Sequence, residues 1–287
     1  MAHRLGWFST GRDEEARELF RSVLAEIKSG TIDAEIGCVF CNRCEGEDGE
    51  SDAFIELVRE SDMELVCLSS RSFKPELRKA GLRESPDVGI PSANLLRWRN
   101  EYDTEVLRSI KRFEVQLGVL AGYMLITGNL CERLPLINLH PALPGGPKGT
   151  WQEVMWQLIE GRAERTGAMM HLVTPVLDEG PPLTYAEVEL RGAEFDPLWS
   201  DLERRLQSKA LDAIVADEAE NEPLFAQIRA REFELEIPLL IMTLKELAAG
   251  RLTVEDTEIR FNGKRLINGL CVTQQVRDYI RAKGRTK

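Results

Sequence analysis

The chain has 287 residues, of which 43% are hydrophobic, and its formal net charge is −11. This composition is typical of a globular protein with its own core, and the negative charge disfavours binding to a nucleic-acid backbone. The longest apolar runs, VQLGVLAGYMLI and IPLLIMTL, are too short to cross a bilayer, and no secretory leader opens the sequence. We therefore expect a cytoplasmic protein that binds neither membrane nor nucleic acid.

Strand patterns alternate with helix patterns over the first part of the chain. A strand at 4–10 is followed by a helix at 12–30, with acids in its first turn and Gly30 at its end. Further strands are predicted at 34–41, 63–70, 116–124, 134–140 and 166–174, and further helices at 51–61, 102–115 and 150–161. This alternation predicts an α/β fold, in which helices cover both faces of a Rossmann-like, mostly parallel twisted sheet.

The C-terminal part of the sequence has a different pattern. Residues 195–232 are helix-rich and highly charged, and we interpret them as a helical insertion in a core formed by residues 1–194. A closing helix is predicted at 237–250, and alternating residues around Asn262-Gly263 predict a hairpin with a tight turn. The segment 233–287 therefore adds a helix, a hairpin and a basic, solvated tail to the same domain.

Three closely spaced cysteines raise the question of a metal site. Cys38, Cys41 and Cys44 have the C-x2-C-x2-C spacing of some iron–sulfur and zinc sites, but no fourth ligand follows nearby. Alternation along the predicted strand directs Cys38 and Cys41 to opposite faces. We therefore expect free thiols and no metal.

Two polar residues interrupt the apolar strand at 134–140. Asn138 and His140 are two apart, so they project from the same face, about 6 to 7 Å from each other, at the carboxyl end of the strand. The next strand leads into a loop that contains Asp178, and this loop is long enough to place the Asp178 carboxylate beside Asn138 and His140, in an opening at the strand end that we call the mouth. A carboxylate beside an imidazole stabilises the imidazolium and raises its pKa. An amide and an imidazolium together suit an oxyanion that develops on a carbonyl.

The sequence also lacks a Ser or Cys in a nucleophile-elbow motif, which favours direct transfer to an incoming amine over a covalent intermediate. With these features, INLHPALP and HLVTPVLDEGPPL closely resemble the glycinamide ribonucleotide formyltransferase family. STGRD, AEIGCVFCNR, NEYDTEVL, VLAGYMLIT and AAGRLTVEDTEIRFNGKRL extend the resemblance over most of the chain except roughly 195–232. Amino sugar and methionyl-tRNA formyltransferases carry the same Asn-x-His and Asp set.

This resemblance implies a role for each matching residue. Asn138 would bind the formyl oxygen, His140 would stabilise the oxyanion as an acid, and Asp178 would hold and charge that imidazole. His171 matches a histidine often found near the family's site, and we treat it as secondary. The residues implied in folate binding are Asn138, Arg99 and the segment Met124, Leu125, Ile126 and Thr127.

The loop Gly11, Arg12 and Asp13 matches the loop that holds the substrate phosphate at a helix N-terminus. Two positions depart from the family: Asp13 stands where asparagine is usual, and Leu125 where arginine is usual. The carboxylate of Asp13 would repel a phosphate, although Arg12 could offset it.

The prediction from the resemblance is formyl transfer from 10-formyltetrahydrofolate, as co-substrate, to glycinamide ribonucleotide in purine biosynthesis. The enzyme would be a monomer or homodimer without a metal. The alternatives are a formyltransferase for another amine, such as an amino sugar nucleotide, and a non-catalytic folate- or nucleotide-binding regulator.

Overall fold

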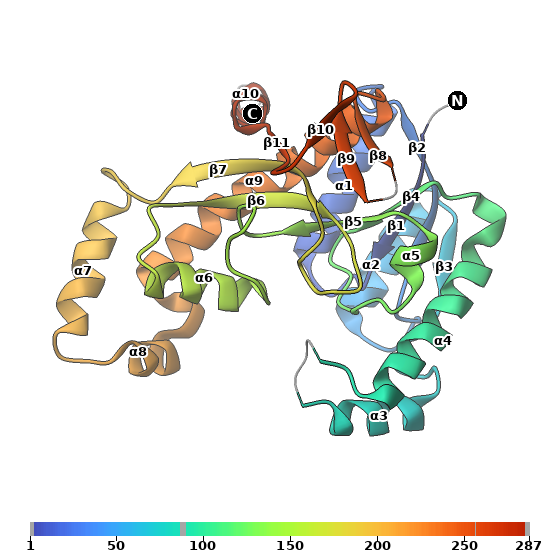
Figure 1. The fold of residues 1–287 in the computed structure, drawn as a ribbon, viewed down its shortest axis with the longest axis horizontal. Helices are drawn as coiled ribbons and strands as arrows, with labels where there is room; N and C mark the ends of the chain where they lie inside the picture. The colour runs from blue at the N-terminus through green and yellow to red at the C-terminus, as the bar shows by residue number, and fades with distance from the viewer. Residues whose placement is uncertain (1–2, 87–89, 256, 285–287) are drawn as a thin grey trace.

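The computed structural model describes residues 3–86, 90–255 and 257–284. Within these residues, a central sheet of eight strands runs in the order β11-β7-β6-β5-β4-β1-β2-β3 (Figure 1). The strands are β1 (His3–Ser9), β2 (Ala34–Cys41), β3 (Leu65–Cys67), β4 (Leu117–Leu120), β5 (Leu136–His140), β6 (Arg165–Leu172), β7 (Pro182–Glu189) and β11 (Leu270–Cys271).

The larger part of the sheet is parallel. Strands β3, β2, β1, β4 and β5 all run in one direction, whereas β6 is antiparallel to both β5 and β7, and β11 is parallel to β7. The predicted mostly parallel α/β fold is therefore confirmed. The chain crosses from one side of β1 to the other between β3 and β4, and such a switch point is where open α/β sheets bind their ligands.

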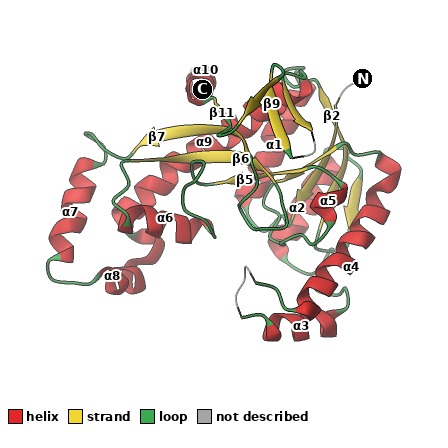
Figure 2. Cartoon of the chain, in the orientation of Figure 1, coloured by secondary structure: helices red, strands yellow, loops and turns green. Residues whose placement is uncertain are grey.

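Helices cover both faces of this sheet (Figure 2). Trp7 lies in the apolar cluster under α1, α2 and the C-terminal half of α9, whereas its neighbour Phe8 lies in the cluster under α4 and α5. This is the alternation expected for a strand buried on both sides. The helices are α1 (Glu14–Lys28), α2 (Gly49–Glu60), α3 (Pro75–Glu84), α4 (Ala93–Ile110), α5 (Leu130–Arg133) and α9 (Pro223–Ala248).

A third apolar cluster lies outside the central sheet. Trp199, Ile214 and Phe225 pack there against Val154 and Met155, so the predicted insertion is packed on the core through α6. In Figure 1 these helices form the lobe on the left. They are α6 (Trp151–Glu160), α7 (Asp196–Leu206), α8 (Leu211–Glu218) and the short η2 (Ala219–Asn221).

Helix α9 differs from the two separate segments expected from the sequence. It runs without a break over 26 residues and through Pro238, so the expected insertion boundary at 232 falls inside it. Proline removes one backbone N–H from the helix. The helix continues because its first half is buried in the third cluster, around Phe225, and its second half on the sheet, around Leu239. Tertiary packing thus outweighs a local breaker.

Other elements differ in extent from their predicted ranges. Strand β4 ends at Leu120, so most of the segment predicted as strand up to residue 124 is a loop. Helix α4 begins at Ala93 rather than at 102, and β3 has only three residues. Helices α3 and α5 and strand β7 have no counterpart in the prediction. They are short or lack a clear period, and long-range packing stabilises them.

The C-terminal hairpin is present as predicted. Asn262 and Gly263 have φ angles of 49° and 77°, the left-handed conformations that a tight hairpin turn requires. They join β9 (Glu258–Phe261) to β10 (Lys264–Leu266), and β8 (Leu252–Glu255) completes a small three-stranded sheet. Helix α10 (Thr273–Gly284) includes the start of the basic tail, whereas 285–287 lie outside the described residues.

Candidate active site

Asn138 and His140 lie at the carboxyl end of β5, on the face of the sheet that packs against α4 and α5. The apolar residues that begin this strand, Leu136 and Ile137, are fully buried and anchor it between β4 and β6. His140 is only 3% exposed. The sequence therefore places an amide and an imidazole on a rigid strand rather than on a mobile loop.

Asp178 reaches this strand end from the loop between β6 and β7, which hangs below β5 and β6 in Figure 1. Its Oδ2 atom lies 3.7 Å from His140 Nδ1, and its Oδ1 atom lies 3.7 Å from His171 Nε2. Asp178 has a φ of 52°, a left-handed conformation that aspartate tolerates better than most residues. Gly180 allows the loop to lie against Leu172, because a Cβ there would stand 1.5 Å from the Leu172 carbonyl oxygen.

Both ring nitrogens of His140 face acceptors. Nε2 lies 2.9 Å from the carbonyl oxygen of Pro147, and Nδ1 faces the Asp178 carboxylate. A neutral imidazole has one N–H, whereas an imidazolium has two and can donate to both partners. His140 can therefore donate to one of these two acceptors as a neutral ring and to both only as an imidazolium.

His171 is held in the opposite way. Its Nδ1–H donates to the Leu172 carbonyl at 3.1 Å, which leaves Nε2 to accept from Asn138 Nδ2 at 3.2 Å. Burial lowers the pKa of His171 despite the nearby carboxylate of Asp178, so the ring is neutral at pH 7. Its contact with Asn138 orients the amide and leaves the second Nδ2 hydrogen for a ligand.

The structure thus brings four of the predicted residues into one cluster at the mouth: Asn138, His140, His171 and Asp178. The two imidazole rings stand nearly perpendicular, with their centroids 6.2 Å apart and the Asp178 carboxylate within reach of both. The arrangement offers two N–H donors, from the amide of Asn138 and the imidazole of His140, to an oxygen that gains negative charge. Such donors stabilise a transition state best when they are buried and held in place.

The segment Met124 to Thr127 lies in a loop beside this cluster. The Met124 N–H donates to Thr10 Oγ1 at 2.8 Å, while the Met124 side chain is 49% exposed. Asp103 of α4 holds the end of the loop, accepting from Gly128 N at 2.6 Å and Leu130 N at 2.9 Å. Burial raises the pKa of Asp103 to about 6. In a loop held in this way, backbone N–H and C=O groups that a β-sheet would pair remain available for a ligand.

Arg99 lies one turn before Asp103 on the same helix. It is 8% exposed and has no hydrogen bond or ion pair with any residue that the structure describes. Burial lowers the pKa of its guanidinium, and the charge of Asp103 opposes that effect. A buried arginine without a fixed partner is suited to bind an anionic ligand group.

The loop Gly11–Asp13 begins α1 on the other face of the sheet. Gly11 has a φ of 63° and lies against Phe54, so a larger residue does not fit there. The Asp13 carboxylate caps the helix by accepting from Ala16 N at 2.9 Å, and it also pairs with Arg12 at 3.1 Å. The expected phosphate site is therefore a helix N-terminus that already carries a carboxylate of its own.

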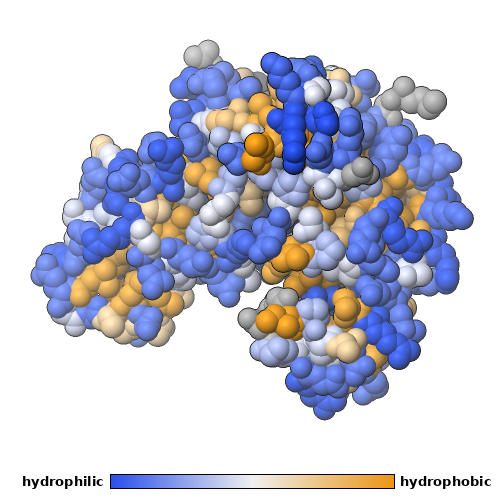
Figure 3. Space-filling view, in the orientation of Figure 1, coloured by the Kyte–Doolittle hydropathy of each residue, from blue (hydrophilic) through white to orange (hydrophobic). Residues whose placement is uncertain are grey.

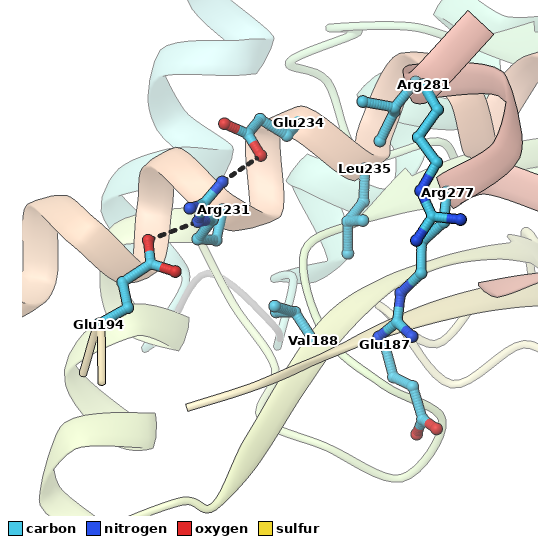
Figure 4. Close-up of a pocket in the computed structure, with 9 residues that line it drawn as sticks. Glu187, Val188, Glu194, Arg231, Glu234, Leu235, Arg277 and Arg281 are labelled. Atoms are coloured by element: carbon cyan, nitrogen blue, oxygen red, sulfur yellow. Dashed lines mark hydrogen bonds and ion pairs between the residues drawn. The ribbon is translucent and has the colours of Figure 1, made fainter. Parts of the chain in front are cut away.

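Two grooves lie away from this cluster. One, of about 270 Å³, lies between β7, α9 and α10, where Figure 4 shows Arg231 between Glu194 and Glu234, with Arg277 and Arg281 on the other side. The second, of about 310 Å³, lies beside the first turn of α1. There Arg229 pairs with Glu15 at 3.1 Å, which compensates the charge of this acid in the first turn of α1.

The three clustered cysteines are free thiols. Cys38 and Cys41 are fully buried in the apolar clusters on opposite faces of the sheet, as predicted from alternation, and Cys44 is partly exposed. Burial raises the pKa of the Cys38 and Cys41 thiols to about 12, which makes them poor ligands and nucleophiles. Among the described residues, no group of three or more His, Cys, Asp or Glu side chains could hold a metal, and no helix is long and apolar enough to cross a membrane.

Three groups that shape the site have no counterpart in the sequence-based prediction: the Pro147 carbonyl, the ion pair between Lys148 and Glu179 (2.7 Å), and Asp103. The ion pair links the loop after β5 to the loop that carries Asp178. Asp103 had a detectable signal, because it is an acid in the apolar stripe of a helix, beside Tyr102 and Val106. The other two depend on contacts between distant loops.

The fold is that of an α/β protein, and the candidate cluster lies at the carboxyl ends of strands beside a topological switch point. The model of the family described as Formyl transferase matches residues 15–216, and the chain belongs to this family. Over 129 residues it is 32% identical to a phosphoribosylglycinamide formyltransferase of Schizosaccharomyces pombe, a match that covers 38% of this chain and 62% of the relative. The corresponding enzyme of Escherichia coli is 29% identical over 138 residues, covering 45% and 62%. The chain thus spans less than two thirds of the length of these relatives.

Two solved structures share the fold. A phosphoribosylglycinamide formyltransferase from Coxiella burnetii superposes with a TM-score of 0.63 at 18% identity, covering 94% of this chain and 99% of the other. A formyltetrahydrofolate deformylase from Pseudomonas syringae gives a TM-score of 0.60 at 18% identity, covering 91% and 66%. At this level of identity the likeness concerns the fold alone.

Proposed function

We propose that the protein transfers a formyl group from 10-formyltetrahydrofolate to the primary amine of glycinamide ribonucleotide. The observation that carries this proposal is the buried cluster at the end of β5. There the amide of Asn138 and the imidazole of His140, whose two ring nitrogens face Pro147 and Asp178, can both donate to one oxygen. Membership in the formyl transferase family and the named relatives support the same reaction.

The roles of the cluster follow from its hydrogen bonds. In the substrate complex, Nε2–H of His140 turns from the Pro147 carbonyl to the formyl oxygen, and the free Nδ2 hydrogen of Asn138 donates to the same atom. The amine nitrogen bonds to the formyl carbon and loses a proton, while the bond from that carbon to the folate nitrogen breaks and the folate nitrogen gains a proton. Asp178 keeps His140 charged as the oxygen becomes negative. The two hydrogen bonds to the formyl oxygen are strongest when this oxygen is negatively charged, so they stabilise the transition state more than the substrate and lower the barrier.

The folate side of the mouth comprises the loop Met124–Thr127 and Arg99. The backbone of this loop offers donors and acceptors to a pterin ring, and Asp103 fixes its conformation. Arg99 offers to a carboxylate of the co-substrate a guanidinium that has no hydrogen bond or ion pair within the part of the chain that the structure describes. Leu125 stands where the family usually has an arginine, so we assign it a backbone contact alone.

The acceptor side comprises Gly11, Arg12 and Asp13 at the start of α1. Arg12 and the helix N-terminus attract a phosphate, whereas the Asp13 carboxylate repels it. The Asp13 carboxylate is the specific observation that favours the second candidate, formyl transfer to a different amine such as an amino sugar nucleotide, because a carboxylate accepts hydrogen bonds from sugar hydroxyls.

The test is an assay with 10-formyltetrahydrofolate and purified protein, with glycinamide ribonucleotide set against a panel of amino sugar nucleotides. We expect formylation of glycinamide ribonucleotide with the highest kcat/KM of the panel. Transfer to another amine alone would replace the first candidate with the second, and transfer to none would refute both. Complementation of a purine auxotroph tests the first candidate in cells.

A further inference from the structure

An exposed ion pair connects the two loops that surround His140. These loops are residues 141–150, between β5 and α6, and residues 173–181, between β6 and β7. Lys148 Nζ lies 2.7 Å from Glu179 Oε1, and the two side chains are 52% and 51% exposed. Within the residues that the structure describes, no other hydrogen bond or ion pair joins these two loops. We call the pair of Lys148 and Glu179 the loop bridge.

The loop bridge lies directly beside both partners of His140. Pro147, whose carbonyl oxygen is 2.9 Å from His140 Nε2, is the residue before Lys148. Asp178, whose carboxylate is 3.7 Å from His140 Nδ1, is the residue before Glu179. The bridge therefore sets the spacing between the two groups that face opposite nitrogens of one imidazole ring.

The two loops differ in how firmly other contacts hold them. On the first loop, the Lys148 carbonyl accepts from Gln157 Nε2 of α6 at 3.0 Å. At the tip of the second loop, residues 175–177 are exposed, and the Val176 side chain reaches 55% exposure. The bridge therefore ties the less supported loop, which carries Asp178, to a loop that is anchored on a helix.

The location of the bridge matters more than its strength. An exposed ion pair adds little to global stability, because water screens it and both side chains lose conformational freedom. In the proposed reaction, however, His140 Nε2 exchanges the Pro147 carbonyl for the formyl oxygen, while Asp178 has to remain beside Nδ1. During this exchange the imidazole no longer connects the two loops, and the bridge is the contact that still does.

We propose that Lys148 and Glu179 are positioning residues, which keep Asp178 beside His140 while the formyl group is transferred. This inference rests on the proposed function, since it takes His140 and Asp178 as the groups that act on the oxyanion. Without the bridge, the loop of Asp178 occupies the productive position for a smaller fraction of the time. The rate of the chemical step then falls, while both substrates still bind.

The test is a double-mutant cycle on steady-state formyl transfer, with Lys148→Gln, Glu179→Gln and the combined variant. Each single variant should lower kcat about three- to fivefold, the upper range for loss of an exposed ion pair, and change each KM less than about twofold. The combined variant should lose no more than the single variants, because its second substitution removes a group that already lacks its partner. Lys148→Arg keeps the charge and should retain at least about half of the wild-type kcat.

Lys209→Gln is the matched control. Lys209 pairs with Asp217 at 2.6 Å in the helical lobe, so this variant breaks a similar exposed pair and changes the net charge by the same amount as Lys148→Gln. It should leave kcat and both KM values unchanged. Urea unfolding curves of all the variants show whether a lost rate comes from the loops or from a damaged fold.

Four results would overturn the inference while the proposed function stands. They are an unchanged kcat in both single variants, a change in KM alone, an equal loss in the Lys209→Gln control, and a combined loss of about 9- to 25-fold, which is the product of independent effects. Wild-type protein that transfers formyl to no amine would refute the proposed function, and this inference with it.

Discussion

The two ends of the site differ in how their charges are arranged. At the end of β5, His140 and Asp178 are almost fully buried, and the ring nitrogens of His140 face the Asp178 carboxylate and the Pro147 carbonyl. At the start of α1, Arg12 and Asp13 are much more exposed, and Asp13 is used to cap its own helix. Under the proposed function, this difference predicts that the buried groups at β5 take part in the chemistry, whereas the choice of acceptor depends on charges in contact with water. Changes at the first end should therefore alter the rate, and changes at the second should alter substrate preference.

The largest effect is expected at His140. His140→Ala removes the charged donor, and kcat should fall about 100- to 1000-fold with a small change in KM for either substrate. Steady-state formyl transfer measures this, and His140→Gln serves as a second variant in case the alanine form unfolds. An unchanged kcat in a folded variant would refute the role of His140.

Asp103 holds the loop on the proposed folate side of the mouth, and its titration should change the free energy of unfolding with pH. The folded-state pKa of about 6 exceeds the ordinary value of 3.8, so between these pH values the folded protein holds a proton that the unfolded chain has released. Asp103 therefore lowers the free energy of unfolding as pH rises from about 4 to 6, by up to about 3 kcal/mol. Asp103→Asn keeps the acceptor oxygen and removes the titration.

Urea unfolding at several pH values tests this prediction through the difference between Asp103→Asn and wild type. The variant should gain stability relative to wild type as pH rises through this window. A parallel pair of pH profiles would contradict the raised pKa.

A smaller effect is expected at His171, which accepts from Asn138. His171→Leu leaves an N–H of the Asn138 amide without its partner, and kcat should fall about tenfold because the amide is no longer held. His171→Gln offers an acceptor again and should restore most of the rate. If both variants lose the same activity, His171 acts by packing alone and does not orient the amide.

The smallest effect is expected at Asp13. Asp13→Asn keeps a good N-cap while it removes a negative charge, so KM for a phosphorylated amine should fall about three- to tenfold, with kcat and the folate KM unchanged. Glu18→Gln, exposed on the same helix, is the control for net charge. A fall of the same size in the control would show that long-range charge, rather than the loop, sets KM.

Much of the fold was predictable from local patterns. The strands predicted at 4–10, 34–41 and 134–140 agree with β1, β2 and β5 to within two residues. They were predictable because buried parallel strands are continuous apolar runs between more polar helices. Helix α9 was predicted only in part, because the burial of its two halves outweighs the break expected at Pro238. The apolar residues after β4 predict a strand, whereas the structure has a loop there. The hydrogen bonds from this loop to Asp103 and Thr10 are long-range and cannot be predicted from its own residues.

Local patterns were enough to predict the α/β class and the placement of Asn138 and His140 on one face of a strand, because side-chain alternation is a local property of an extended backbone. They also predict that Asp178 follows the next strand. The tertiary structure places Asp178 between two imidazoles, lowers the pKa of His171 by burial and sets His140 between two acceptors. These outcomes depend on which loops meet at the edge of the sheet and on how far water is excluded there, and no local pattern encodes either.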